Sequence, residues 1–469
     1  MKKIKFLLIS AAFAFGFASC GDSYFDVEMD QNKESETAFT TALDVKNGMI
    51  GAYYALGSYY FYGKNVVALG DMASDIAIAS SSTGHFYYIN SYLISDTNSE
   101  LNEIWNYGYK IIDRTTRTIN GAENVLEGDV LEYDEYSIYS YISQCYALRA
   151  LATFTLTNIF GLPYQAGQTN NQLGVILITD KPLTINDEVH RSSVEDCYAQ
   201  ILKDIELAKE YYVGDFEMNG APQFYFNLGA IYALEARVNL FMGNYEAAKE
   251  AAQNAIDERD SNGVTASSYA YMWTSNAISE EDILTISKTN DDNLSANALN
   301  TLYGSYKGDI TDFTYDIFSE NDYRAAILDN YAYKYCGLPT AQAVSNIPVF
   351  RVSEMYLIIA ECEANLNNLD EAKDALFYTA QRDADITSTD DLPSTKEEII
   401  SFINDERVRE LYLEGHRWFD ARRQGLKITV AAGSVQDFDV AKFVYPIPAA
   451  EINAGYGTEQ NDGWEDYLP

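Results

Sequence analysis

The sequence has few basic side chains for its length. Its 469 residues include 32 Lys and Arg against 70 Asp and Glu, which gives a formal net charge of −38 at pH 7. Nucleic acids and anionic lipid surfaces are bound through clusters of Lys and Arg, and no such cluster is visible. The charge balance therefore excludes nucleic acid as a partner, disfavours a strongly anionic polysaccharide, and favours a neutral or weakly charged ligand.

Cysteine and histidine are also scarce, with 5 Cys and 3 His. No CxxC spacing occurs, so a zinc site lacks its usual ligands. We expect the isolated cysteines to be small buried hydrophobic residues, although an even number in an oxidising compartment leaves disulfide pairing open. The four in question are Cys145, Cys197, Cys336 and Cys362.

Motifs of common enzyme classes are missing as well. The sequence contains no GxSxG elbow, no Gly-rich phosphate loop and no HExxH site, and we predict no catalytic residue, metal or cofactor. A calcium loop at Asp260–Gly263 is incomplete, because the full acidic spacing and the closing Glu are absent. A glycosidase acting through two carboxylates is a less favoured alternative, since 70 acidic residues always allow some pair to be drawn.

The N-terminus has the order of a secretory signal peptide. Lys2, Lys3 and Lys5 precede an apolar run at 6–17, which is too short to span a bilayer permanently. Small residues then lead to Cys20, as in the sites that lipoprotein signal peptidase cuts, so we expect Cys20 to carry acyl chains that hold the protein on a membrane. An ordinary secreted protein with a chance cysteine is the alternative.

The rest of the chain is expected to form one body. We predict a signal peptide at 1–19, a lipidated acidic tether at 20–40, and a folded body at 41–469 with halves at 41–225 and 226–469. A hydrophobic content of 47% with 22% charged residues is typical of globular proteins.

The predicted body is mainly helical. Apolar residues recur every three to four positions from Thr41 to Tyr60, around Trp105, and in two hairpin-like segments at 228–256 and 356–376. Small residues in both segments would let paired helices approach closely, as in tetratricopeptide repeats, although two unrelated hairpins remain an alternative. Between them, long irregular connections include one predicted short strand at 282–287.

The most specific sequence motifs lie near the C-terminus. Residues 351–361 read RVSEMYLIIAE, residues 404–425 read NDERVRELYLEGHRWFDARRQG, and residues 445–461 read YPIPAAEINAGYGTEQN. With IWNYGYKII at 104–112 and ALRALATFTLTNIFGLPY at 147–164, these segments closely resemble the SusD/RagB family of outer-membrane lipoproteins of Bacteroidetes.

The resemblance implies a function as well as a SusD-like fold. Such a protein is a lipid-anchored binder exposed at the cell surface, which captures an oligosaccharide, or in some members a peptide, and passes it to a SusC-like TonB-dependent transporter. It would not be an enzyme. A purely structural adaptor is a further alternative, because helical repeats often bind only other proteins.

The long C-terminal motif is interpreted as structural. We expect one helix in which apolar residues share a face and charged residues pair along another, with His416 as a packed residue rather than an acid or base. The apolar positions are Val408, Leu411, Tyr412, Gly415 and Phe419, and the charged ones are Arg407, Glu410, Glu414, Arg417 and Asp420.

Two aromatic clusters in predicted loops are the candidate ligand contacts. Sugar sites combine flat aromatic side chains with a few polar groups. The first cluster comprises Phe86, Tyr87 and Tyr88 together with Asp75, and the second comprises Trp273, Tyr303, Tyr306, Phe313 and Tyr315. Trp105, Trp418 and Trp464 are expected to be structural.

Overall fold

The structure is a computed structural model that describes residues 38–184, 186–214, 218–328, 333–335 and 343–469. The predicted signal peptide, Cys20, most of the tether and Cys336 lie outside the described residues. Within those ranges, no helix combines the length and the apolar character that crossing a membrane requires.

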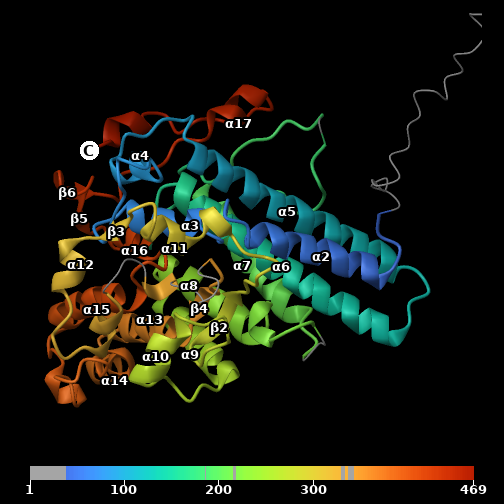
Figure 1. Cartoon of the computed structure of the whole chain (residues 1–469). Coiled ribbons are helices and arrows are strands. Elements are labelled where there is room, and N and C mark those ends of the chain that lie inside the picture. The colour runs from blue at the N-terminus through green and yellow to red at the C-terminus, as the bar shows by residue number, and fades with distance from the viewer. Residues whose placement is uncertain (1–37, 185, 215–217, 329–332, 336–342) are drawn as a thin grey trace, which may run out of the picture.

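Helices make up most of the described body, as predicted, and they form two neighbouring groups (Figure 1). The first group contains α2 (Ala42–Leu56), α3 (Asn65–Met72), α4 (Tyr87–Asn90), α5 (Ser99–Leu126), α6 (Glu132–Phe160) and α7 (Val194–Glu210). The second contains α8 (Leu228–Met242), α9 (Tyr245–Arg259), α10 (Ala266–Met272), α11 (Leu299–Tyr303), α12 (Asp312–Asp316), α13 (Val352–Asn365), α14 (Leu369–Ala380) and α15 (Lys396–Leu411). The last two helices return to the first group: α16 (Arg417–Gln424) packs on α3, and α17 (Ala449–Ala454) lies by the start of α5.

The long helix α6 is the centre of the first group. From Ser137 onward almost all of its side chains are buried, because α2, α5, α7 and α8 pack around it. Gly108 lets α5 approach closely, since a Cβ there would lie 2.8 Å from Leu156. Trp105 is 1% exposed and belongs to this core, which confirms the prediction.

The two predicted hairpins are confirmed. Helix α8 packs on α9 and α13 packs on α14, and α9 also packs on α13, so the two copies lie side by side. Small residues at the contacts, including Ala248, Ala252 and Ala372, are fully buried. The fold is therefore a tetratricopeptide-like scaffold in which segments more than a hundred residues apart form one layer.

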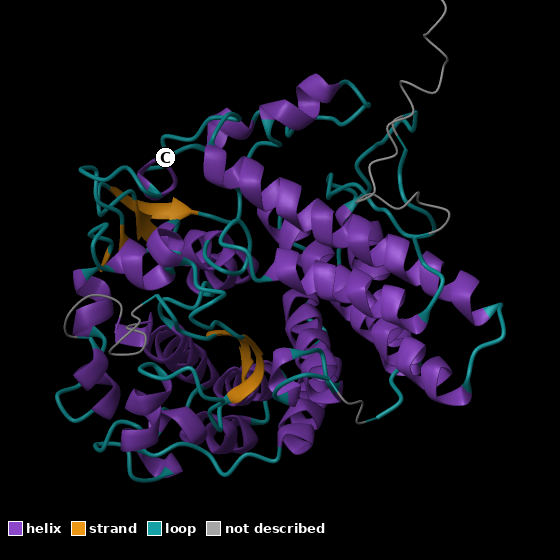
Figure 2. Ribbon diagram, turned by 45° about the vertical axis from the view of Figure 1, so that its right-hand side comes forward, coloured by secondary structure: helices purple, strands orange, loops and turns teal. Residues whose placement is uncertain are grey.

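In the part of the chain that the structure describes, strands are few and short (Figure 2). Three antiparallel pairs join β1 (Ala77–Ile78) to β3 (Asp309–Ile310), β2 (Asp282–Ile286) to β4 (Ile347–Arg351), and β5 (Lys427–Val430) to β6 (Val435–Asp439). The predicted strand at 282–287 is confirmed as β2. The pairing of Ala77 with Ile310 fixes the long insertion, the segment between α9 and α13, beside the connection that follows α3.

The long motif at 404–425 is not one helix, so the prediction of a single shared face is wrong. Helix α15 ends at Leu411 and α16 begins at Arg417, and the turn between them has positive φ at Leu413 (60°) and Gly415 (83°). Gly415 is required there, because a Cβ would lie 2.8 Å from the Cα of Val67. The turn thus brings the motif against α3.

The charged residues of the motif pair across the fold rather than along a helix. Glu410 contacts Arg324, Arg351 and Arg382, all of them buried. Burial alone would raise the pKa of Glu410, but these guanidinium groups hold it well below its ordinary range. The network fixes how α13, α15 and the insertion pack.

The other predicted charges of the motif have similar long-range partners. Arg407 lies 2.7 Å from Asp420 across the break between the helices, and Arg417 lies 2.8 Å from Asp75. Glu414 pairs with Arg351 at 2.7 Å. The predicted pairing along one helical face is therefore wrong for these residues, because the chain turns between them.

Several buried positions follow the predictions. Cys145, Cys197 and Cys362 are free and buried, and Trp418 and Trp464 are buried at 0% and 8% exposure. His416 is largely buried with Nδ1 3.9 Å from Glu354, and burial lowers the pKa of His416 to about 4. It is a neutral packed residue near pH 7.

Candidate functional site

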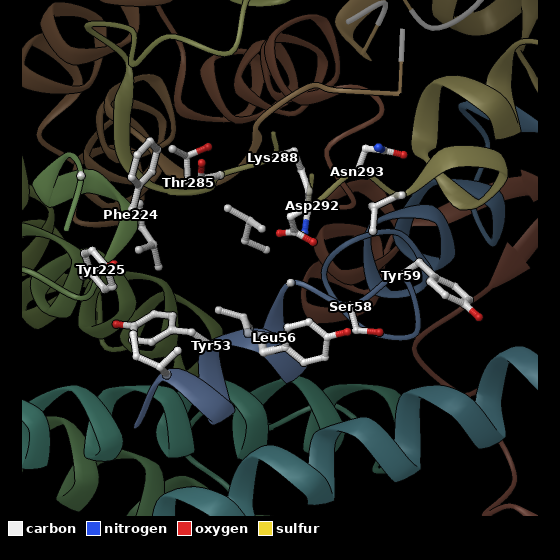
Figure 3. A pocket seen from close by; sticks show the side chains of 18 of the residues that line it. Tyr53, Leu56, Ser58, Tyr59, Phe224, Tyr225, Thr285, Lys288, Asp292 and Asn293 are labelled. Atoms are coloured by element: carbon white, nitrogen blue, oxygen red, sulfur yellow. The ribbon is translucent and has the colours of Figure 1, made fainter. Parts of the chain in front are cut away.

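A pocket of about 700 Å³ opens between the two groups of helices (Figure 3). Its walls are the C-terminal end of α2 with the turn that follows, the connection before α8, and β2 with the loop after it. We call it the tyrosine pocket. Its lining includes Ile50, Tyr53, Tyr54, Gly57, Ser58, Tyr59, Tyr60, Tyr107, Asn219, Phe224, Tyr225, Thr285, Ile286, Lys288, Asp292, Asn293 and Asn297.

Aromatic rings form much of this lining. Tyr53 meets Tyr225 edge to face with ring centroids 5.3 Å apart, and Tyr60 lies between Tyr59 at 3.9 Å and Tyr107 at 4.8 Å. In Figure 3, Phe224 and Tyr225 stand on one side of the opening and Tyr59 on the other. Rings held by their neighbours offer flat apolar surfaces at little cost in side-chain entropy.

Tyr54 is the most exposed ring of the set. It is 72% exposed and projects from α2 beside Ile50, which is 37% exposed. Its ring stands in water at the edge of the pocket that it lines. Tyr54 is therefore available to a ligand.

The polar lining carries little net charge. Lys288 Nζ lies 3.1 Å from Asp292, so the charged lysine and carboxylate offset each other. The amide side chains of Asn219, Asn293 and Asn297 supply further donors and acceptors. Within the described part of the chain, the buried Thr285 hydroxyl has no hydrogen-bond partner. The pocket suits a neutral ligand rich in hydroxyl or amide groups.

Local structure explains why these side chains meet. The Tyr53 hydroxyl donates to Gln144 of α6 and accepts from the backbone N–H of Phe226, both at 2.8 Å. This holds the connection before α8 against α2. Gly57 ends α2, and a Cβ there would lie 3.1 Å from Ile286, so the glycine allows β2 to approach.

The two predicted aromatic clusters meet at a second place. His85 stacks on Tyr306 with ring centroids 3.8 Å apart and an angle of 12°, and the Thr83 hydroxyl donates to the Tyr306 carbonyl at 2.8 Å. Tyr87 and Tyr88 contact each other nearby, and Tyr88 is 56% exposed. We call His85, Tyr87, Tyr88 and Tyr306 the His85–Tyr306 surface.

Other predicted residues lie elsewhere. Trp273, Tyr303 and Phe86 are at most 2% exposed, so their predicted position on a loop surface is wrong: these three rings turn into the core. The Trp273 ring lies 4.8 Å from the Lys334 ammonium, beside the buried charges. Ligand contact by these three remains an untested prediction.

Asp75, Phe313 and Tyr315 form a third environment. Asp75 makes a two-point contact with Arg417, whose guanidinium also lies 5.7 Å from the Phe313 ring. Phe313 and Tyr315 on α12 are each 39% exposed. Asp75 is thus occupied by an ion pair, and the two rings are exposed but separate from the tyrosine pocket.

The tyrosine pocket was missed by reasoning from sequence. The strongest signal for it in the sequence is the run YYALGSYYFY at 53–62. Tyr53 and Tyr60 fit the apolar helical period, which predicts that they are buried. The tyrosines beside them, Tyr54 and Tyr59, do not fit this period and were the available clue.

No group of three or more metal-ligating side chains exists within the described ranges. The incomplete calcium pattern begins at Asp260, which ends α9 in a left-handed conformation. A polar turn accounts for it.

The layer of paired helices makes this a tetratricopeptide-like helical protein. Its long connections form the tyrosine pocket. Two family models match consecutive parts of the chain: "SusD family" over residues 234–464 and "Starch-binding associating with outer membrane" over residues 23–240. The chain belongs to the SusD/RagB family.

Solved structures and a curated relative agree with this assignment. The chain resembles a putative sugar binding protein from Bacteroides vulgatus, with 26% identity, a TM-score of 0.81, and coverage of 91% of this chain and 100% of that one. A SusD superfamily protein from the same organism gives 25% identity and the same TM-score and coverage. SusD-like protein P38 of Formosa agariphila is 23% identical over 98% of this chain and 99% of its own length.

Proposed function

We propose that this protein binds a neutral glycan at the cell surface and delivers it to a SusC-like TonB-dependent transporter in the outer membrane. The observation that carries the proposal is the tyrosine pocket, where stacked rings and uncharged polar groups line a space of about 700 Å³. Sugar rings offer apolar faces to aromatic side chains and hydroxyl groups to amides, so both parts of the lining have a role.

Two further observations support it. A solved neighbour is described as a putative sugar binding protein, and one matching family model carries the words "Starch-binding associating with outer membrane". The signal-like N-terminus with Cys20 supplies an anchor by acylation, which would place the body on the outer face of the membrane. The protein would act by binding alone, without turnover.

Binding is tested by calorimetry of the soluble body against a panel of neutral glycans. We expect one glycan class to bind and Tyr54→Ala or Tyr225→Ala to weaken it by up to about tenfold each, the effect of losing one aromatic contact. Tyr133→Ala is the matched control, because Tyr133 is 68% exposed at the start of α6 and outside the pocket. Binding only to a peptide panel, or release of new reducing ends, would overturn the proposal.

Delivery is tested separately. Full-length protein should co-purify from outer membranes with a TonB-dependent barrel, and Cys20→Ala should release it into the soluble fraction. A protein that stays membrane-bound after Cys20→Ala contradicts the anchor. One that never co-purifies with a barrel contradicts the delivery step.

A further inference from the structure

The Lys64 side chain lies between the tyrosine pocket, at Tyr59, and the segment that carries His85, at Phe86. We propose that the tyrosine pocket and the His85–Tyr306 surface are two ends of one binding surface, joined at Lys64, and that this surface takes a glycan chain long enough to rest on both. The inference rests on the proposed function and adds to it the path of the bound glycan: one chain contacts the tyrosine pocket, Lys64 and the His85–Tyr306 surface together.

The first wall of this surface is continuous in the sequence. Tyr59 stands at the end of the pocket opposite Tyr225 (Figure 3). Lys64 follows at the start of α3, and its ammonium lies 5.4 Å from the Tyr59 ring and 5.7 Å from the Phe86 ring. One side chain therefore contacts both the pocket and the segment that carries His85.

The position of His85 agrees with this. Phe86 is buried, so its neighbours His85 and Tyr87 form the surface at that point. Burial and the nearby Lys64 ammonium both lower the pKa of His85, which places the imidazole within electrostatic reach of the lysine. Near pH 7 the His85 imidazole is therefore neutral.

The second wall is the segment from Asn293 to Tyr306, which begins on the same side of the pocket as Tyr59. Asn293 lies on the Tyr59 side of the opening in Figure 3, and the pocket lining continues to Asn297. Thr301 in α11 donates through its hydroxyl to the Ser295 carbonyl at 3.0 Å and accepts through its carbonyl from the Tyr306 N–H at 2.9 Å. These bonds hold the wall from the pocket rim to Tyr306 in one compact unit.

At the end away from the pocket, the Thr83 hydroxyl donates a hydrogen bond to the Tyr306 carbonyl, which joins the two walls. The surface then has aromatic rings at both ends and the half-buried Lys64 between them. An ammonium group is a hydrogen-bond donor only, which suits the hydroxyl and ring oxygens of a sugar chain. A glycan chain that lies along this path would gain contacts at both ends. The second contact would cost no further translational entropy, because it forms within the same complex.

Chain length is the variable that tests this. Calorimetry would use four series of oligosaccharides (malto-, cello-, xylo- and manno-), each of increasing length from the disaccharide to the octasaccharide. Each series is called a ladder below. In the ladder that binds, affinity should rise with length by about tenfold or more between the ends of the series, which is about 1.4 kcal/mol. His85→Ala and Tyr225→Ala should each weaken the octasaccharide by about threefold to tenfold, as expected for one aromatic contact.

The disaccharide separates the two ends. Because it can occupy only one of them, only one of these two variants should weaken it. Lys64→Met, which keeps the apolar stem and removes the charge, should weaken the octasaccharide more than the disaccharide. Tyr133→Ala again serves as the control, and unchanged circular dichroism shows that each variant folds.

Three results decide the outcome. If the disaccharide and octasaccharide bind equally, or if His85→Ala leaves the octasaccharide unaffected while Tyr225→Ala weakens it, the shared surface is overturned and the proposed glycan binding stands. If no ladder and no glycan of the wider panel binds, the proposed function itself falls. Length-dependent loss in both His85→Ala and Tyr225→Ala supports the inference.

Discussion

Arg351 and Glu414 form a two-point ion pair inside the protein. The Nε and Nη2 atoms of Arg351 donate to the two carboxylate oxygens of Glu414, each at 2.7 Å. Arg351 begins the segment RVSEMYLIIAE and Glu414 lies in the turn of the long motif, so the pair joins the two most specific stretches of the sequence. The pair thus joins two distant segments of the chain in the packed core.

Loss of this pair should be costly. Arg351→Ala removes one cationic partner from both buried carboxylates, Glu410 and Glu414, and leaves the buried cluster one positive charge short. We expect about 3–5 kcal/mol less free energy of unfolding in urea denaturation. Arg117→Ala is the control, because its pair with Asp113 is 40% and 39% exposed. That variant should lose no more than about 1 kcal/mol. Equal losses in both variants would contradict the central place of Arg351.

The buried His416 should make stability depend on pH above the range of the carboxylates. Its folded-state pKa of about 4 lies below the ordinary 6.5, so the unfolded chain takes up a proton first as the pH falls. Between pH 7 and pH 5 we expect His416 to lower the free energy of unfolding by about 2 kcal/mol. Above pH 7 its contribution to stability stays constant, because it is neutral in both the folded and the unfolded chain.

The test is urea denaturation at both pH values. His416→Gln should reduce the difference between them, whereas His190→Gln, with a side chain 60% exposed, should not. The buried Glu406 and Glu414, whose pKa values lie below the ordinary 4.5 because nearby Arg and Lys outweigh burial, lose their contribution only as the pH falls further. An unchanged difference in His416→Gln would assign the pH dependence to other groups.

Asp71 tests the contact between α3 and the turn of the motif. Its Oδ2 accepts from the Gly415 N–H at 3.0 Å, and burial raises the pKa of Asp71 well above its ordinary value. Asp71→Asn keeps an acceptor and removes the buried charge, so its melting temperature at pH 8 should equal or exceed that of the wild type. Asp71→Ala leaves the N–H unpaired and should lose about 1–3 kcal/mol. Equal losses in both variants would show that the charge itself is needed.

Tyr53 positions the pocket rather than only lining it. Tyr53→Phe removes the hydroxyl that accepts from the Phe226 N–H, and we expect a loss of about 1–3 kcal/mol by chemical denaturation. Glycan affinity should fall as well, because Tyr225 adjoins Phe226 in the chain and the Phe226 N–H loses its acceptor. Tyr54→Phe is the matched control: its ring is exposed, and its stability should stay within about 0.5 kcal/mol of the wild type.

The sequence by itself determined the helical scaffold, the two hairpins, strand β2, the buried cysteines and the family. These follow from local information, because the apolar period of a helix and the small residues of a hairpin contact are written in neighbouring positions. The segment RVSEMYLIIAE was specific for the same reason: its apolar residues and its buried Arg351 occur together in one short stretch.

Only the tertiary structure decided where the chain turns after Leu411, which rings are buried and where the pocket lies. The turn depends on α3 approaching Gly415 and on arginines distant in sequence, so no helical period reveals it. Trp273 is buried because Lys334 and Arg351 lie against it. The tyrosine pocket combines side chains from α2, the connection before α8 and the loop after β2, and contacts between such distant segments leave no pattern in the sequence.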